Sequence, residues 1–239
     1  MILAIETATS ACSAAVLAAD GALVAQRLED QGPAHTQRLL PFVHEVLGEA
    51  GVTLGDLDAV VCGLGPGAYT GMRIGVATAR ALAQAAGLRL GGAPTLAAVA
   101  LSLAVGAASG TPLVALLDGK RHEVFAGVFH ADAQGGTLIE VAPLAVVAAD
   151  DLTGYLDRWP GAVVGGDGAA LYADVIPATA SVAPDTARPA AAMVGRAWLA
   201  RVPGAVEGFA AVLPVYGRAP DATRWRAGPG AAPGAKGAS

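Results

Sequence analysis

The sequence is poor in cysteine, aromatic residues and charge, and each shortage narrows the range of protein classes. Its 239 residues include two cysteines, 5% aromatic residues and 15% charged residues, whereas 54% are hydrophobic. Cys12 and Cys62 are far apart and form no C-x-x-C pair. They are predicted to be reduced, buried thiols of a cytoplasmic protein, because disulfides form mainly in oxidising compartments.

Basic residues do not outnumber acidic residues, since the chain has 15 lysines and arginines and 20 aspartates and glutamates. The formal net charge is −5, which argues against a protein that binds nucleic acid unaided. Residues 219–239 differ from the rest, because they consist mainly of alanine, glycine and proline with scattered basic residues. This segment has too little apolar content to dock, and it is predicted to be a disordered tail.

No segment is predicted to span a membrane. Residues 90–117 carry no charge and are long enough to do so. However, Pro94, Gly106 and Pro112 interrupt this run, and no aromatic residues flank it. The first residues lack a basic region typical of a signal peptide. A soluble protein with a buried helix, a turn and a buried strand in this region is expected.

Common catalytic motifs are absent, but one glycine-rich segment is distinctive. The chain has no Walker A loop, no G-x-G-x-x-G fingerprint, no H-E-x-x-H and no G-x-S-x-G. Residues 63–75 read Gly-Leu-Gly-Pro-Gly-Ala-Tyr-Thr-Gly-Met-Arg-Ile-Gly. A buried strand precedes them and an alanine-rich helix follows, with Thr70 as its expected N-cap.

Two interpretations of this loop remain open. A strand, a glycine loop and a helix N-terminus together form a geometry that accepts phosphate. The alternative is a tight turn whose glycines serve packing alone. Under the first interpretation the segment and the polar turn after the first strand form vestigial phosphate-binding loops. The residues assigned to these loops are Thr7, Ser10, Gly65, Gly67 and Thr70.

The order of predicted elements suggests an α/β fold. Residues 1–5, 11–18 and 22–28 are predicted to form three antiparallel strands. Helix, strand and helix follow, with Pro41 inside the first helix at 36–50 and further helices at 95–105 and 188–202. This order resembles the nucleotide-binding half of the actin, Hsp70 and sugar-kinase superfamily. The resemblance implies two actin-like, ribonuclease-H-like halves, each a mixed sheet flanked by helices, at residues 1–108 and 109–218.

Three motifs resemble one bacterial family in particular. The run Gly-Pro-Gly-Ala-Tyr-Thr-Gly-Met-Arg-Ile-Gly at 65–75 is similar to the Gly-Pro-Gly-Ser-Phe-Thr-Gly-Leu-Arg-Ile-Gly signature of the bacterial TsaB family, relatives of TsaD once called glycoproteases. Residues 35–41 and the Pro-x-Tyr-x-Arg ending at Arg218 are also similar. The hairpin at 118–125 resembles the family less closely, since it differs at Gly119, Lys120 and Phe125.

The resemblance implies a function and partners. It implies a non-catalytic scaffolding subunit of a complex that installs threonylcarbamoyl on adenosine 37 of tRNAs reading codons that begin with A. The implied partners are a TsaD-like catalytic subunit and a TsaE-like ATPase, with tRNA bound only through the complex. The chain alone would form a homodimer. No cofactor of its own is implied, because ATP and the threonylcarbamoyl-adenylate belong to the complex.

The metal site of the catalytic relative is missing from this sequence. TsaD has a His-x-x-x-His pair where this chain has Ala-Pro-Thr-Leu-Ala-Ala-Val at 93–99. Those residues offer no metal ligand, so no metal and no catalytic residue is expected. The alternative function is a small-molecule kinase or ATPase of the same superfamily. It would need an acidic pair, for which Glu6 and Asp118 are the candidates.

The second helix is predicted to form a partner interface. Its apolar arc is about twice as wide as a helix lying on a sheet needs. The excess implies a second covering surface, made with an exposed edge of the first helix. Of arginines placed at Val76 and Ala81, one is expected to unfold the protein and the other to abolish pairing. The residues assigned to this interface are Leu39, Gly71, Met72, Arg73, Ile74, Gly75, Val76, Arg80 and Ala81.

Overall fold

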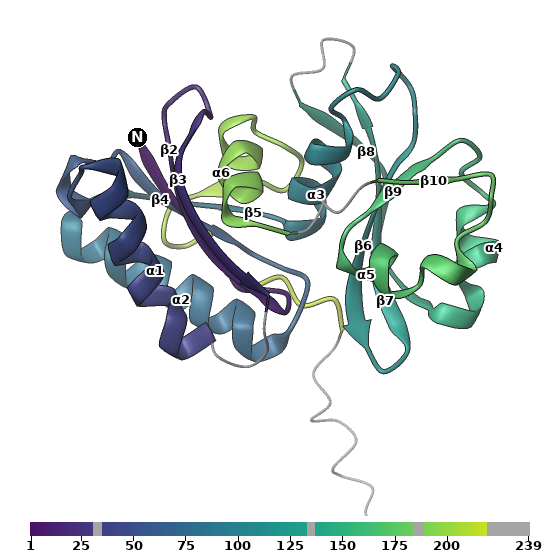
Figure 1. The fold of residues 1–239 in the computed structure, drawn as a ribbon, viewed down its shortest axis with the longest axis horizontal. Coiled ribbons are helices and arrows are strands. Elements are labelled where there is room, and N and C mark those ends of the chain that lie inside the picture. Colours follow the sequence, from purple (N-terminus) through teal and green to yellow (C-terminus); the bar gives the residue numbers. More distant parts are fainter. Residues whose placement is uncertain (31–34, 133–136, 184–188, 219–239) are drawn as a thin grey trace, which may run out of the picture.

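The computed structural model describes residues 1–30, 35–132, 137–183 and 189–218. The chain forms two halves, each built on one β-sheet, that lie side by side (Figure 1). The tail expected at 219–239 lies outside the described residues.

The first sheet has six strands in the order β11-β5-β4-β1-β2-β3. β1, β4 and β5 run parallel, whereas β1, β2 and β3 form an antiparallel meander and β11 pairs antiparallel to β5. β1, β2 and β4 are buried along their whole length, as their continuous apolar runs predict. The strands are β1 (Ile2–Glu6), β2 (Ala11–Leu17), β3 (Leu23–Asp30), β4 (Ala59–Gly63), β5 (Arg89–Ala93) and β11 (Val206–Glu207).

The second sheet repeats this plan with five strands in the order β10-β9-β6-β7-β8. β6, β7 and β8 form an antiparallel meander, and β6, β9 and β10 are parallel. The repeated mixed topology confirms the predicted fold class of two actin-like halves. The strands are β6 (Leu113–Lys120), β7 (Glu123–Ala131), β8 (Leu138–Ala148), β9 (Val163–Gly165) and β10 (Ser181–Val182).

Helices cover both faces of each sheet and give a layered molecule (Figure 1). α1 and α2 pack on the outer face of the first sheet, α3 and α6 lie between the two sheets, and α4 and α5 pack on the outer face of the second. The helices are α1 (His35–Ala50), α2 (Tyr69–Ala86), α3 (Thr95–Leu103), α4 (Leu152–Leu156), α5 (Asp167–Leu171) and α6 (Ala191–Leu199), with 3₁₀ turns at Leu54–Asp56, Ala149–Asp151 and Ala173–Val175.

Small aliphatic side chains fill the core between these layers. The layer between the sheets gathers alanine, valine and leucine from β1, β4, β6, α3 and α6. Both cysteines are free and buried, as predicted. Burial raises the pKa of the Cys12 thiol to about 11, which leaves it protonated and unreactive at neutral pH.

The predicted boundary of the second half is wrong at its C-terminal end. The prediction assigned residues 109–218 to one unit, but α6 packs on β1, β2 and β4 of the first sheet. β11 then joins that sheet as an edge strand beside β5. The chain therefore returns to the first half after residue 190, and the second sheet's own elements end at β10.

The helix limits also differ in detail from those predicted. The helix expected at 188–202 is shorter, because α6 covers only Ala191–Leu199, and α3 ends at Leu103 rather than at residue 105. Pro41 lies inside α1, where it removes one backbone donor from the helix. Among the helices within the described residues, none is long and apolar enough to cross a bilayer.

Candidate functional site

The glycine-rich loop after β4 is fixed by backbone hydrogen bonds to three other parts of the chain. The Ala68 N–H donates to the Ala8 carbonyl at 2.6 Å, and the Thr95 N–H donates to the Gly65 carbonyl at 2.8 Å. The Val215 N–H donates to the Leu64 carbonyl at 2.7 Å. The β1–β2 turn, the start of α3 and residues 208–218 therefore meet at this loop. We call residues 208–218 the C-terminal segment.

The glycines of this loop make room for the β1–β2 turn. A Cβ atom on Gly67 would overlap the Ala8 carbonyl, and one on Gly75 would overlap the Thr7 hydroxyl. That hydroxyl donates to the Gly71 carbonyl of α2 at 2.8 Å. Of the two interpretations left open by the sequence, these contacts favour packing.

The five residues assigned to phosphate binding do not gather around one cavity. Thr7 is buried against α2 and Gly65 is also buried. Ser10 lines a cavity of about 300 Å³ near Asp167, whereas Gly67 lines a separate cavity of about 530 Å³. Thr70 is not the N-cap that the sequence predicted: α2 begins at Tyr69, so Thr70 is its second residue.

The N-cap of α2 is Ala68, whose extended backbone starts the helix without a side-chain hydrogen bond. The side chain of Ala68 is a methyl group and cannot accept a hydrogen bond from the first turn, although the Ala68 carbonyl accepts from the Met72 N–H at 3.0 Å. The loop's own backbone contacts, and not a threonine cap, hold the start of this helix.

Glu6 is a fully buried acid at the end of β1. One carboxyl oxygen accepts a hydrogen bond from the Ala8 N–H at 2.5 Å, and the other accepts from the Thr95 hydroxyl at 2.8 Å. A Cβ atom on Gly63 would overlap this carboxyl group. Burial raises the pKa of Glu6 above its usual 4.5, although these hydrogen bonds oppose the shift. Both oxygens are thus occupied by the protein itself.

The raised pKa of Glu6 predicts a pH-dependent stability. The folded chain holds this proton more tightly than the unfolded chain, so the neutral acid favours folding. The contribution is fully present below pH 4.5 and is lost as pH rises through the raised pKa. Glu6→Gln, which keeps the shape without the charge, is expected to remove this dependence in urea unfolding measured from acidic to neutral pH.

The control for this experiment is Glu140→Gln, because Glu140 is exposed. It is expected to leave the pH dependence unchanged. Asp167 also has a pKa raised by burial, so its own part of the pH dependence should persist in Glu6→Gln and be removed in the double variant with Asp167→Asn. Equal pH dependence in Glu6→Gln and the parent chain would contradict the prediction.

The acidic pair required by the kinase alternative is engaged in internal contacts. Besides the two hydrogen bonds of Glu6, the Asp118 carboxylate pairs with the Lys120 ammonium at 2.5 Å. The Asp118 N–H in turn donates to the Asp167 carboxyl at 3.0 Å. Among the described residues, no three histidine, cysteine, aspartate or glutamate side chains are grouped so as to hold a metal ion.

The residues predicted to form an interface on α1 and α2 divide between core and surface. The buried residues expose almost no surface to a partner, which corrects that part of the assignment. They are Leu39, Gly71, Met72, Gly75 and Val76.

The remaining interface residues lie at or near the surface. Arg73 and Ala81 are exposed, and Ile74 and Arg80 are partly exposed. Arg80 donates to the carbonyl groups of Phe209 and Val212, so it holds the C-terminal segment against α2. Arg73 donates to the Tyr69 hydroxyl at 2.7 Å.

The outward face of this helix pair includes small uncharged residues beside charged ones, among them Glu45 of α1 and Arg73 of α2. α1 and α2 lie side by side on the outside of the first half (Figure 1). Leu40 of α1, which the sequence reasoning did not select, is 55% exposed. Leu40 stands between Leu39 and Pro41, and the sequence pattern did not show that its side chain is exposed while that of Leu39 is buried. Tyr69, Arg73 and Gln84 of α2 are also exposed. The exposed small residues of α2 are Thr70, Ala77, Ala81 and Ala85. We call these four residues and Leu40 the helix-pair surface.

Comparison with known proteins identifies the class. The sequence model of the family described as "TsaD: tRNA N6-adenosine threonylcarbamoyltransferase" matches residues 29–163. The solved structure of YeaZ from Pseudomonas aeruginosa superposes with a TM-score of 0.69 at 30% identity, covering 90% of this chain and 98% of that one. The fold and the glycine-loop helix therefore define an actin-like protein of the TsaD-like class.

Two curated relatives narrow the assignment. The tRNA threonylcarbamoyladenosine biosynthesis protein TsaB of Escherichia coli is 40% identical over 137 residues, which are 56% of this chain and 57% of that protein. An uncharacterized protein of Mycobacterium tuberculosis H37Rv is 34% identical over 224 residues, 92% of this chain and 93% of that one. The chain belongs to the TsaB family. It spans 34% and 57% of the length of two relatives that are each 40% identical.

Proposed function

We propose that this chain acts in tRNA threonylcarbamoyladenosine biosynthesis as a non-catalytic subunit that docks a TsaD-like catalytic partner on its helix-pair surface. The membership of the TsaB family supports the pathway, because the Escherichia coli relative carries that function in its name. In this proposal the chain acts in the cytoplasm, and ATP and the threonylcarbamoyl-adenylate are used by the assembled complex. A TsaE-like ATPase and tRNA join through the partner.

The proposal that the partner docks here rests on the residues that α1 and α2 expose. The exposed residues of α2 include three alanines and Thr70 as well as Arg73 and Gln84, and Leu40 of α1 is exposed too. Small side chains allow the axis of another helix to approach closely, since interaxial distances depend on the residues at the contact. Burying an exposed leucine contributes about 1.5–3 kcal/mol. In the absence of the partner, a second copy of this chain would cover the same surface.

The non-catalytic role is supported by the state of the acidic groups. Both carboxyl oxygens of Glu6 accept internal hydrogen bonds, and Asp118 is paired with Lys120. Neither group offers an open ligand position for a Mg²⁺ ion bound to phosphates, which phosphoryl transfer requires. The proposal therefore assigns the transfer chemistry to the partner.

The test is binding of the TsaD-like protein from the same genome, measured by analytical ultracentrifugation. Ala81→Arg is expected to stay folded and to weaken the association at least about tenfold, because it inserts a charge into an interface core depleted of charge. Ala170→Arg is the matched control, an exposed helical alanine in the second half. Unchanged association of Ala81→Arg would place the interface elsewhere.

A reconstitution assay tests the pathway separately. The chain alone is expected to form no threonylcarbamoyladenosine in tRNA. Addition of the TsaD-like and TsaE-like proteins with ATP and the threonylcarbamoyl-adenylate should produce the modified nucleoside, because the adenylate supplies the transferred group and leaves as adenosine monophosphate. Modification that proceeds equally well without this chain would contradict the proposed role.

A further inference from the structure

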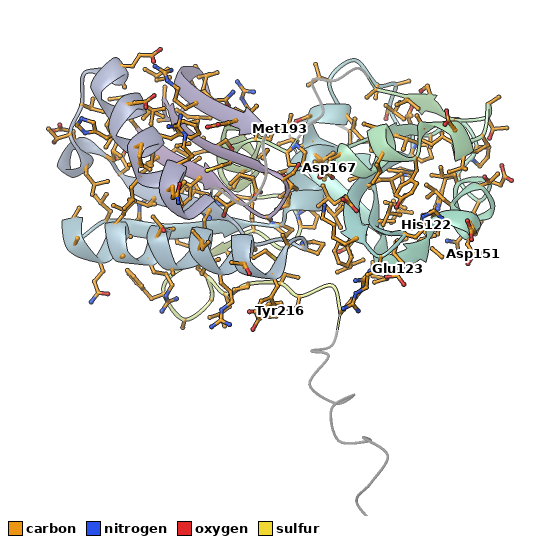
Figure 2. All side chains as sticks on the ribbon, turned by 60° about the horizontal axis from the view of Figure 1, so that its bottom comes forward. His122, Glu123, Asp151, Asp167, Met193 and Tyr216 are labelled. Atoms are coloured by element: carbon orange, nitrogen blue, oxygen red, sulfur yellow. The ribbon has the colours of Figure 1, made fainter. Side chains whose placement is uncertain are left out.

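A cavity of about 530 Å³ lies where the two halves meet. Three segments far apart in the sequence form it: the start of α2, the β6–β7 hairpin and the C-terminal segment. Figure 2 shows Tyr216 and Glu123 on either side of this junction. The volume falls within the range of small-molecule sites, about 300–1,000 Å³.

One wall of the cavity is aromatic. The rings of Tyr69 and Tyr216 are stacked with their centroids 5.3 Å apart, and they are 56% and 44% exposed. Phe125 of β7 forms the opposite side and is almost fully buried. Gly217 lies against it, and a Cβ atom there would overlap the Phe125 ring. Flat rings that stay accessible at a cavity are suited to stacking on another planar group.

The other wall is basic. Lys120 and Arg121 come from the hairpin and Arg218 comes from the C-terminal segment, and within the described part of the chain no carboxylate lines the cavity. Two of these cations are paired with carboxylates, Lys120 with Asp118 and Arg218 with Glu123. The five groups together carry one net positive charge, in a chain whose formal net charge is −5. The local charge therefore favours an anion.

The hairpin that carries Lys120 and Arg121 has a strained backbone conformation. Lys120, Arg121 and His122 have φ angles of 60°, 56° and 62°. Two-residue hairpin turns of this hand usually contain asparagine and glycine, because side chains with a Cβ atom adopt positive φ at a cost. The turn is held from behind, where the Ala149 N–H donates to the His122 carbonyl at 2.9 Å. Strain of this kind is often found at binding sites.

We propose that this cavity binds a nucleotide, with the base stacked on the Tyr69–Tyr216 pair and the phosphate held by Lys120, Arg121 and Arg218. The aromatic wall and the basic wall face the same space, and a base joined to a phosphate matches both. The bound nucleotide bridges the α2 side of the first half and the hairpin of the second half. The proposal comprises binding and no reaction, and the described residues that line the cavity include no carboxylate.

The test is calorimetric titration of the full chain with adenosine monophosphate, with adenosine alone and inorganic phosphate as separate arms. The monophosphate is expected to bind more tightly than either fragment and more weakly as salt increases. Tyr216→Ala is expected to weaken it about tenfold, a typical loss for one stacked base. Lys120→Gln is expected to weaken it and to reduce the salt dependence.

Two substitutions serve as controls. Phe209→Ala removes an exposed aromatic ring that, like Tyr216, belongs to the C-terminal segment. The guanidinium of Arg80 lies over the Phe209 ring. Arg201→Gln removes a cation that, like Lys120, has positive φ and pairs with a carboxylate. Both are expected to keep full affinity, and circular dichroism confirms that each variant is folded.

Absence of binding at millimolar adenosine monophosphate would overturn this inference, as would equal losses in the controls. Binding that Tyr216→Ala and Lys120→Gln leave unchanged would place the nucleotide elsewhere and overturn it as well. Since no partner is present in the titration, its result is independent of whether Ala81→Arg weakens association with the TsaD-like protein.

Discussion

Arginine in place of Val76 is expected to leave the chain largely unfolded at 25 °C. Val76 is 4% exposed and packs in the cluster between α1, α2 and the first sheet. An unpaired buried charge costs several kcal/mol, and a domain of this size has only about 5–15 kcal/mol of total stability. Loss of far-UV circular dichroism and of a cooperative urea transition would show the effect.

The neighbouring variant Ala81→Arg is the control for this prediction. Ala81 lies on the same helix but is exposed, so the longer side chain reaches water and the free energy of unfolding should change by less than about 0.5 kcal/mol. A folded Val76→Arg protein with an unchanged urea midpoint would mean that the buried face of α2 is not part of the core.

The sequence predicted a wide apolar arc on α2. It did not predict which flank of that arc packs on the sheet and which is exposed. The apolar arc includes both Val76 and Ala81, and periodicity alone does not say which flank meets the sheet. Small residues blur the pattern further, because alanine occurs on the buried side at Ala79 and on the exposed side at Ala77. Met72 of α2 was assigned to a partner surface for this reason, although its side chain is 2% exposed.

The fold class was predictable and the domain boundary was not. Buried strands such as β1 and β4 are short apolar runs, and the glycine loop between β4 and α2 identifies the family. The return of α6 to the first sheet depends on contacts distant in sequence, such as the Ala191 N–H that donates to the Ser13 hydroxyl at 2.8 Å. No local pattern around residue 190 contains that information.

The cavity between the halves illustrates the same limit. Tyr69, Lys120 and Tyr216 are separated by about fifty to a hundred residues, and each has an ordinary sequence context. The hairpin around Lys120 was interpreted as a solvated charged turn, which its composition favours. Only the tertiary structure brings these side chains to one cavity.

Alanine in place of Gly67 is expected to destabilise the protein by about 2–4 kcal/mol, from overpacking and loss of a buried hydrogen bond. The added methyl group would overlap the Ala8 carbonyl. That carbonyl is backbone, already bonded to the Ala68 N–H at 2.6 Å, so neither side has a flexible end that can move away. Gly67 does not have positive φ among the described residues, and the effect therefore measures close packing and not backbone conformation.

The matched control is Gly48→Ala in α1, where nothing lies within 4 Å of the new methyl group. This exchange is expected to stabilise the protein by about 0.5–1 kcal/mol, because alanine favours helix over glycine. Both variants are compared by urea unfolding, in which a changed midpoint with an unchanged slope reports stability. If Gly67→Ala unfolds at the same urea concentration as the parent chain, the glycine loop does not pack against the β1–β2 turn, and phosphate binding again becomes the better explanation of its glycines.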